Sequence, residues 1–301
     1  MGLQAGSIFW ERSPLNGTEE VRQQPKERPE EIIQLITQLK NSASDFLMFI
    51  ETTLRPYLQR RCDTFQARNI SHSLHTWKGI TSDKDILCTV MGMSIDFSDK
   101  PIQQIGEKSV RSESEIQIIS GEINKLLSNR VLEVTEHSDN EIISDIFLRD
   151  KKDGSHRMIL NLKKLNLYAE KVHFKMDTLH TITKLVEKDC FMASIDLKDA
   201  YYFVPITRED RKCLRFLWQG TLFQFTCLPN GLSCAPRKFT KLLKPALSEL
   251  HLRGRISSAY IDDMYLQGKT FKECVHNVID SVTQIDSLGP VAHPEKSVLN
   301  S

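Results

Sequence analysis

Asp262 and Asp263 are the residues of this chain best placed to do chemistry. They lie at a predicted turn, between an apolar strand pattern at 259–261 and its return at 264–266. Like charges packed at a tight turn repel one another unless a cation lies beside them. Carboxylate oxygens are the ligands that Mg²⁺ prefers, so the pair predicts a metal site at this turn.

A third carboxylate, Asp196, follows another apolar strand pattern at 190–195. If that strand neighbours the strands around the turn, Asp196 lies close to Asp262 and Asp263. Three carboxylates at one point can form a two-metal site, which aligns a nucleophilic oxygen and a leaving phosphate oxygen. Each aspartate taken alone has a simpler interpretation as a capping or turn residue, so the prediction depends on the three meeting.

Around these aspartates, from about Ile116 to its C-terminus, the chain resembles the reverse transcriptases. The segments that carry the resemblance are, in order, 147–157, 161–166, 195–202, 228–236, 260–263, 288–289 and 293–296. The sequences of residues 214–220 and 239–245 are most similar to those of the DIRS-like retrotransposon branch. Residues 76–87 resemble that branch as well. The resemblance implies an RNA-directed DNA polymerase, a nucleotidyltransferase encoded by a transposable element.

The resemblance implies an α+β fold with a polymerase palm and a fingers hairpin. In the palm, helices flank an antiparallel sheet, and the mixed order of predicted strands and helices is consistent with this class. The family usually continues beyond the catalytic hairpin into a thumb. The chain ends at Ser301, so we expect a C-terminally truncated domain in which the thumb is absent.

The resemblance also assigns the metal ligands. Asp196, Asp262 and Asp263 would be the catalytic residues and would hold two Mg²⁺ ions, with Mn²⁺ as a substitute. The backbone carbonyl of Leu197 would join them. For Asp199 two interpretations stay open, a metal ligand and a carboxylate that simply pairs with Lys198 beside it.

Four residues match positions at which the family binds the incoming nucleotide. Lys151 and Arg157, on either side of the predicted hairpin turn, match the residues that hold the triphosphate. Tyr201 matches the aromatic residue that excludes a ribose 2′ hydroxyl, which predicts a preference for deoxynucleotides. Asn230 stands where many retroviral relatives have glutamine, and it can still bond a sugar or phosphate with a shorter reach. Without the surrounding motifs, the simpler interpretations are exposed hairpin charges and a core aromatic residue.

The expected partners are an RNA template, a DNA primer and deoxynucleoside triphosphates. The alternative function is a catalytically inactive or co-opted nucleic-acid-binding fragment of the same fold, which the missing thumb favours and the intact acids oppose. An RNA-templated RNA polymerase shares the logic of the palm. Tyr201 argues against it, because such an enzyme must admit the 2′ hydroxyl.

The chain divides into three predicted regions. Residues 1–27 are polar and without a stable period, which predicts disorder. Residues 28–114 comprise a helical region and a linker, in which Pro56 is expected to kink or break the first helix. That helix could bind a partner or pack on the palm. Residues 115–301 are expected to form the fingers and palm.

Composition and charge set the outer limits. The net charge is only +1, yet 149–175 carries eight Lys or Arg against three acids, and 237–255 carries six against one. Such stretches could hold a phosphate backbone or could be solvated surfaces. The seven cysteines show no zinc spacing, and their odd number predicts reduced thiols in an intracellular protein. No apolar run is long enough to span a membrane, and the sequence does not distinguish cytoplasm from nucleus or predict an oligomeric state.

Overall fold

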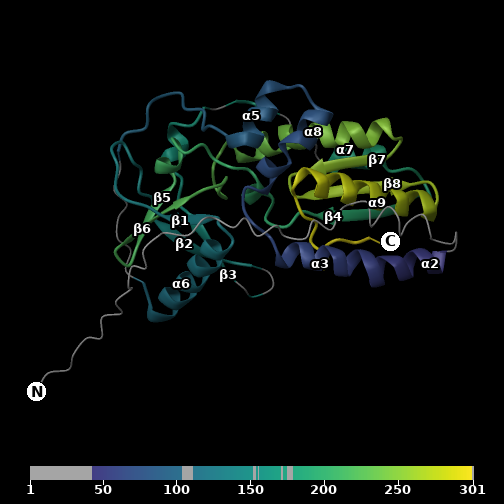
Figure 1. Cartoon of the computed structure of the whole chain (residues 1–301), viewed down its shortest axis with the longest axis horizontal. Helices are drawn as coiled ribbons and strands as arrows, with labels where there is room; N and C mark the ends of the chain where they lie inside the picture. Colours follow the sequence, from purple (N-terminus) through teal and green to yellow (C-terminus); the bar gives the residue numbers. More distant parts are fainter. Residues whose placement is uncertain are drawn as a thin grey trace, which may run out of the picture.

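The computed structural model describes residues 43–103, 111–151, 154, 156–170, 172–174 and 179–299. The disorder expected over 1–27 and the start of the first helix lie outside these residues. The described chain has one part built on the strands that carry the candidate acids, and another with a second sheet and a hairpin, at opposite ends of Figure 1. In the described residues, no helix is both long and apolar enough to cross a membrane.

Three antiparallel strands form the sheet of the candidate acids in the described chain, in the order β4-β8-β7. Their bounds are Phe191–Asp196 for β4, Ile256–Tyr260 for β7 and Asp263–Gly268 for β8. The side chains of Ala193, Ile195, Met264 and Leu266 are buried. They alternate with more exposed residues, as the period of a strand requires. The expected strands are confirmed, although Ile261 belongs to the turn rather than to β7.

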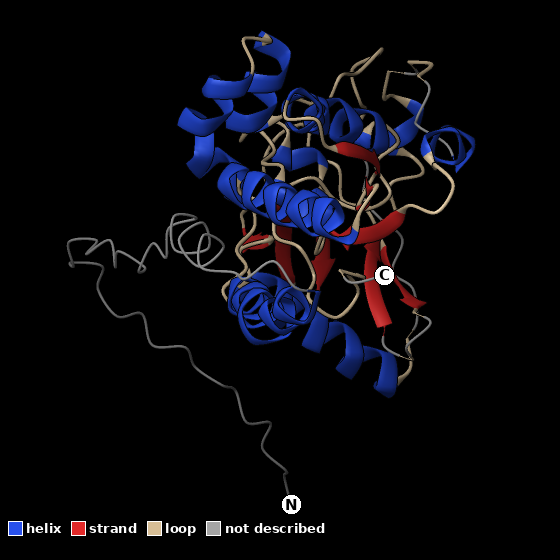
Figure 2. Cartoon of the chain, turned by 90° about the vertical axis from the view of Figure 1, so that its right-hand side faces the viewer, coloured by secondary structure: helices blue, strands red, loops and turns tan. Residues whose placement is uncertain are grey.

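Two long helices, α8 (Ala235–Leu252) and α9 (Phe271–Leu288), pack against this sheet (Figure 2). A Cβ atom at Gly268 would lie 2.2 Å from the backbone nitrogen of Cys274 in the first turn of α9. The end of β8 and the start of α9 therefore touch backbone to backbone, which only glycine permits. A shorter helix, α7 (Leu179–Leu185), precedes β4.

The second part corresponds to the expected fingers. Its elements are α6 (Glu113–Ser128), the sheet of β1 (Leu132–Val134), β5 (Arg215–Trp218) and β6 (Thr221–Phe225), and the hairpin of β2 (Ile146–Asp150) and β3 (His156–Leu160). Ser112 and Glu115 form a reciprocal capping box at the start of α6. Arg149 and Arg157 face each other across the hairpin, which confirms the expected fingers hairpin.

The first described helices run into each other instead of breaking at Pro56. A π-helical turn, Ile50–Leu54, joins α2 (Ala43–Phe49) to α3 (Arg55–Asp63). A proline ring crowds the carbonyl four residues before it, and the wider π turn relieves this contact. Of the expected kink or break at Pro56, the helix therefore shows no break, but its regular α-helical bonding is interrupted just before this proline.

The N-terminal helices α3, α4 (Leu74–Ile80) and α5 (Lys84–Gly92) form a further layer on the palm. Tyr57 and Arg61 of α3 donate hydrogen bonds of 2.6 and 2.7 Å to the carboxylate of Asp286 on α9. The buried indole of Trp77 donates at 2.9 Å to the carbonyl of Leu288. The sequence left two roles open for the N-terminal helix, binding a partner or packing on the palm. The described part of this helix packs on the palm.

Gly289, which ends α9, provides a test of this packing. Its φ is +110°, and a Cβ atom there would lie 2.8 Å from the Cα of Ile70. Gly289→Ala is expected to lower the free energy of unfolding by roughly 3 kcal/mol, since strain and overlap act together. Urea unfolding monitored by circular dichroism measures this change.

Gly254→Ala is the matched control, because Gly254 also has a positive φ of +75° but nothing lies near its Cβ position. It should lose only about 1 kcal/mol from backbone strain. Equal losses in the two variants would show that the contact with the N-terminal segment has no energetic weight.

Candidate active site

The structure brings the three candidate acids to one end of the sheet. Asp196, the last residue of β4, lies directly opposite Asp263, the first residue of β8. Asp262 precedes Asp263 in the turn, and its carbonyl accepts a 2.7 Å hydrogen bond from the N–H of Leu197. The register of the sheet and this turn contact therefore juxtapose segments more than sixty residues apart in the sequence.

The turn itself is strained. Ile261 has a φ of +58°, which is the left-handed region that a β-branched side chain rarely adopts. Such a conformation persists only where the surrounding structure enforces it. The paired strands on either side, with Tyr260 opposite Asp263, supply this constraint.

The pKa values of Asp196 and Asp263 reflect both their burial and their closeness to other acids. Burial raises the pKa of Asp196 to about 6, Lys296 opposes this, and the charges of Asp262 and Asp263 add to the increase. Burial and the charge of Asp262 also raise the pKa of Asp263. A bound cation would relieve this repulsion.

The donor set suits a hard divalent cation, because it consists of carboxylate oxygens that repel one another. Within the described residues, however, no three His, Cys, Asp or Glu side chains are arranged to hold a metal ion. Asp262 and Asp263 are exposed and Asp196 is half-buried.

The C-terminal segment that contains His293 and Ser297 also holds the backbone of Asp196 in place. The N–H of His293 donates to the Asp196 carbonyl at 2.7 Å, and the Asp196 N–H donates to the Ser297 hydroxyl at 3.1 Å. The N–H of Ser194 in β4 donates to the carbonyl of Val298 at 2.8 Å, which extends the contact along the strand. Sequence reasoning missed His293 and Ser297 as supports, since only their proximity in space shows the role.

Tyr201 lies beside the acids. Burial raises its pKa to about 12, with further contributions from the charges of Asp262 and Tyr260. Its ring packs edge-on against Phe239 of α8, with centroids 5.6 Å apart. Tyr202, the next residue, is buried in the core.

The expected nucleotide-pocket turn, 228–236, is tied to the segment after β3. Asn230 donates a long hydrogen bond of 3.5 Å to the hydroxyl of Tyr202. Asn166 donates to the carbonyl of Gly231 at 2.8 Å and accepts from the N–H of Ser233 at 2.9 Å. Asn166 thus clamps this turn with both ends of its amide, a role that the sequence pattern did not assign.

The two basic residues of the fingers hairpin have different neighbours. Arg157 is half-exposed, with a guanidinium nitrogen 4.0 Å from a carboxylate oxygen of Asp199. Lys151 lines a shallow cavity with His156 and residues of α6. That both residues address one triphosphate therefore remains a prediction.

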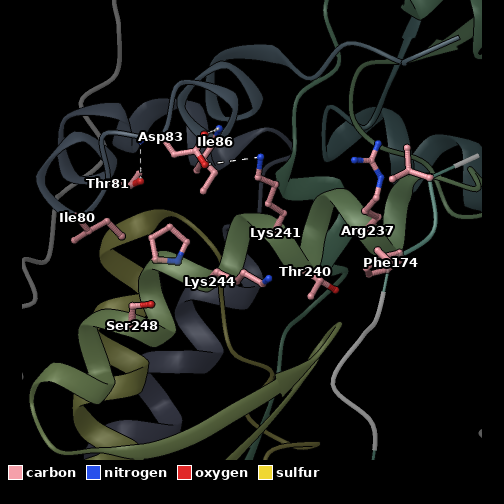
Figure 3. Close-up of a pocket in the computed structure, with 12 residues that line it drawn as sticks. Ile80, Thr81, Asp83, Ile86, Phe174, Arg237, Thr240, Lys241, Lys244 and Ser248 are labelled. Atoms are coloured by element: carbon pink, nitrogen blue, oxygen red, sulfur yellow. Dashed lines mark hydrogen bonds and ion pairs between the residues drawn. The ribbon is translucent and has the colours of Figure 1, made fainter. Parts of the chain in front are cut away.

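A groove of about 630 Å³ separates α8 from the loop between α4 and α5 (Figure 3). Basic side chains of α8 line it, but acids of the N-terminal region already neutralise two of them. Lys241 lies 3.0 Å from Asp85, and Arg237 lies 3.3 Å from Asp96. The basic stretch 237–255 therefore serves in part to dock the N-terminal helices.

The basic stretch 149–175 is different. Arg149, Lys163 and Lys164 are exposed, and none of them forms an ion pair within the part of the chain that the structure describes. Free positive charge at the surface can attract a polyanion. Of the two stretches, this one therefore keeps exposed positive charges, at Arg149, Lys163 and Lys164, that no described acid pairs.

Comparisons with known proteins agree with this geometry. A family model described as "Reverse transcriptase (RNA-dependent DNA polymerase)" matches residues 149–300. The Tf2-3 and Tf2-7 transposon polyproteins of Schizosaccharomyces pombe are 22% identical over 181 residues, which is 60% of this chain and 13% of each polyprotein. The chain thus spans a small fraction of the length of these relatives.

The fold is similar to that of foamy viral protease-reverse transcriptases. The selenomethionine-labelled prototype foamy virus CSH mutant has a TM-score of 0.61 at 23% identity, over 70% of this chain and 27% of that one. The foamy viral enzyme in complex with an RNA/DNA hybrid has a TM-score of 0.63 at 19% identity, over 96% and 35%. At such identities the likeness bears on the fold alone.

The raised pKa of Asp196 predicts a pH-dependent stability. Its folded pKa of about 6 exceeds the ordinary value of 3.8, so the folded state holds this proton more tightly and loses stability as pH rises from about 4 to 6. In metal-free buffer, Asp196→Asn should therefore raise the melting temperature at pH 7. Melting curves at pH 4 and pH 7 measure the difference.

At pH 4 the carboxyl group of the wild-type chain is largely protonated, so the same substitution should have little effect there. A variant that is destabilised equally at both pH values would show that Asp196 is not held against its own charge.

Proposed function

Since this chain belongs to the reverse transcriptase family, we propose that it is the RNA-directed DNA polymerase domain of a retrotransposon. The observation that carries the proposal is the register that sets Asp196 opposite Asp263, with Asp262 adjacent in a strained turn. The reaction would be attack of a primer 3′ oxygen on the α-phosphate of a deoxynucleoside triphosphate.

The chain would contribute metal binding and positioning. Asp196, Asp262, Asp263 and the carbonyl of Leu197 would hold two divalent cations, Mg²⁺ or Mn²⁺. When bound, these ions would supply alignment of the two reacting oxygens and neutralisation of the charge on the phosphate. The closeness of the carboxylates favours this role, because a cation would relieve their mutual repulsion, which adds to the effect of burial on the pKa of Asp196.

Nucleotide selection would fall to residues around the acids. The ring of Tyr201 is held against Phe239, so it could block a 2′ hydroxyl on the sugar. Arg157 and Lys151 would hold the triphosphate, with the planar fork of arginine suited to two phosphate oxygens. Asn230 would bond the sugar or phosphate from the turn that Asn166 clamps.

The proposed partners are an RNA template and a DNA primer. The exposed cations of the stretch 149–175 support this assignment, since they are free to meet phosphates. Related foamy viral enzymes have been solved with double-stranded DNA and with an RNA/DNA hybrid. We also propose that the chain belongs to the DIRS-like branch, because the sequences of residues 214–220 and 239–245 are most similar to that branch.

Primer extension on an RNA template with Mg²⁺ and deoxynucleotides tests the reaction. Asp262→Asn and Asp263→Asn should each reduce extension at least about a hundredfold, because each removes a charge while keeping the side-chain shape. Circular dichroism should show an intact fold in both variants. Wild-type rates in either variant would contradict the metal-ligand assignment.

If the wild-type chain binds template–primer but does not extend it, the alternative of a non-catalytic nucleic-acid-binding fragment becomes the better description. Filter binding of a labelled RNA/DNA duplex, run beside the extension assay, separates these outcomes.

Tyr201→Ala tests the selection of the sugar. Removing the ring should raise the incorporation of ribonucleotides relative to deoxynucleotides by about tenfold or more, which is about 1.4 kcal/mol of discrimination. Tyr201→Phe keeps the ring and should leave selection unchanged. Unchanged discrimination in Tyr201→Ala would show that this residue is not the steric gate.

A further inference from the structure

Lys198 lies two residues after Asp196 and directly before Asp199, yet its ammonium is bound elsewhere. Its Nζ donates a 2.8 Å hydrogen bond to the backbone carbonyl of Cys62, in the last turn of α3. It also lies 5.6 Å from the centroid of the Phe65 ring. In the described residues, no ion pair links Lys198 to either aspartate.

The carboxyl end of α3 is a favourable place for this cation. The last carbonyls of a helix carry partial negative charge and lack partners within the helix. The aromatic face of Phe65 adds a cation–π contact. The Cys62 carbonyl also accepts a 3.3 Å hydrogen bond from the N–H of Phe65, and Lys198 adds a charged contact to this helix end from the loop of the candidate active site.

The end of α3 is itself held firmly. Phe65 packs edge-on against Phe203, with ring centroids 5.2 Å apart. The Cys62 thiol donates to the carbonyl of Ala292 at 3.5 Å, and Arg61 pairs with Asp286 at 2.7 Å. The carbonyl of Cys62, which accepts the hydrogen bond from Lys198, therefore belongs to a firmly packed segment and has a fixed position.

The backbone around Lys198 is linked to the other two segments of the site. Its own N–H donates to the carbonyl of Val291 at 2.9 Å, and the N–H of Leu197 donates to the carbonyl of Asp262 at 2.7 Å. Asp199, which follows, has a left-handed backbone with φ of +46°. A loop in such a conformation needs external contacts to keep it there.

We propose that Lys198 is a positioning residue, which ties the loop carrying Asp196 to the end of α3 and so lets the N-terminal helices set the geometry of the metal-binding carboxylates. The inference rests on the proposed function for its meaning, but the measurement of Mn²⁺ binding that tests it does not. It also adds a role to the N-terminal helices, for which the sequence left open partner binding or packing on the palm.

The sign of the effect on metal binding separates positioning from simple electrostatics. Lys198 carries a positive charge close to a site for cations. If that charge were all that mattered, its removal would strengthen the binding of a divalent cation. If positioning dominates, the same removal weakens binding, because the carboxylates lose their alignment.

The experiment compares Mn²⁺ binding by the full chain and by Lys198→Met, followed by electron paramagnetic resonance of free Mn²⁺ without nucleic acid. Methionine keeps the apolar stem and removes the ammonium. We expect the Kd for Mn²⁺ to rise about tenfold, and kcat for primer extension to fall about tenfold to a hundredfold, as a displacement near 1 Å can produce. Lys198→Arg should restore most of both. An unchanged or lower Kd in Lys198→Met would overturn the proposal.

Lys241→Met is the matched control. Lys241 also joins the N-terminal helices to the palm, through Asp85 and Asp83, but it does so on the groove side of α8. It should leave the Kd for Mn²⁺ unchanged even if the melting temperature falls. An equal weakening of Mn²⁺ binding in both variants would overturn the specific role of Lys198.

If Lys198→Met fails to fold, Phe65→Leu keeps most of the apolar volume and removes the ring beneath the ammonium, together with its edge contact with Phe203. It should weaken Mn²⁺ binding in the same direction, and an unchanged Kd would contradict the proposal. A wild-type chain that binds Mn²⁺ through Asp262 but extends no primer would refute the polymerase assignment and leave the role of Lys198 standing.

Discussion

The repulsion between carboxyl groups at the end of one sheet is the constraint on which this structure depends. Asp196 and Asp263 face each other across adjacent strands, with Asp262 beside them. Without a cation, this arrangement opposes folding at neutral pH, because burial, with the added charges of Asp262 and Asp263, raises the pKa of Asp196 to about 6. The rest of the fold has to keep these groups together in spite of that opposition.

Three segments that are distant in sequence share this task at Asp196. The C-terminal segment holds its backbone through His293 and Ser297. The turn holds the next residue through the carbonyl of Asp262. The N-terminal helices reach the same loop through Lys198. A site held from three directions can tolerate a strained turn such as the one at Ile261, because no single contact has to supply the whole constraint.

The N-terminal helices are therefore an integral part of the packed fold and not an appendage. Their contacts with α9 are specific: Trp77 bonds the last carbonyl of the helix, and Gly289 leaves room for the backbone of Ile70. Their acids also meet the basic side of α8, where Lys241 and Arg237 are paired. The sequence alone suggested that these basic residues of α8 could bind nucleic acid. In the structure, Lys241 and Arg237 instead pair with acids of the N-terminal region.

The sequence by itself determined the elements and the identity of the candidate acids. The helix at 271–288 and the strands around Asp196 and Asp263 follow from apolar periodicity and turn residues, which act over a few neighbours. The tertiary structure alone decided which of these elements meet. The register of β4 on β8, the clamp by Asn166 and the bond from Lys198 to Cys62 join residues far apart in the chain. Such contacts leave no periodic trace in the sequence, because they arise only when separate packed surfaces come together.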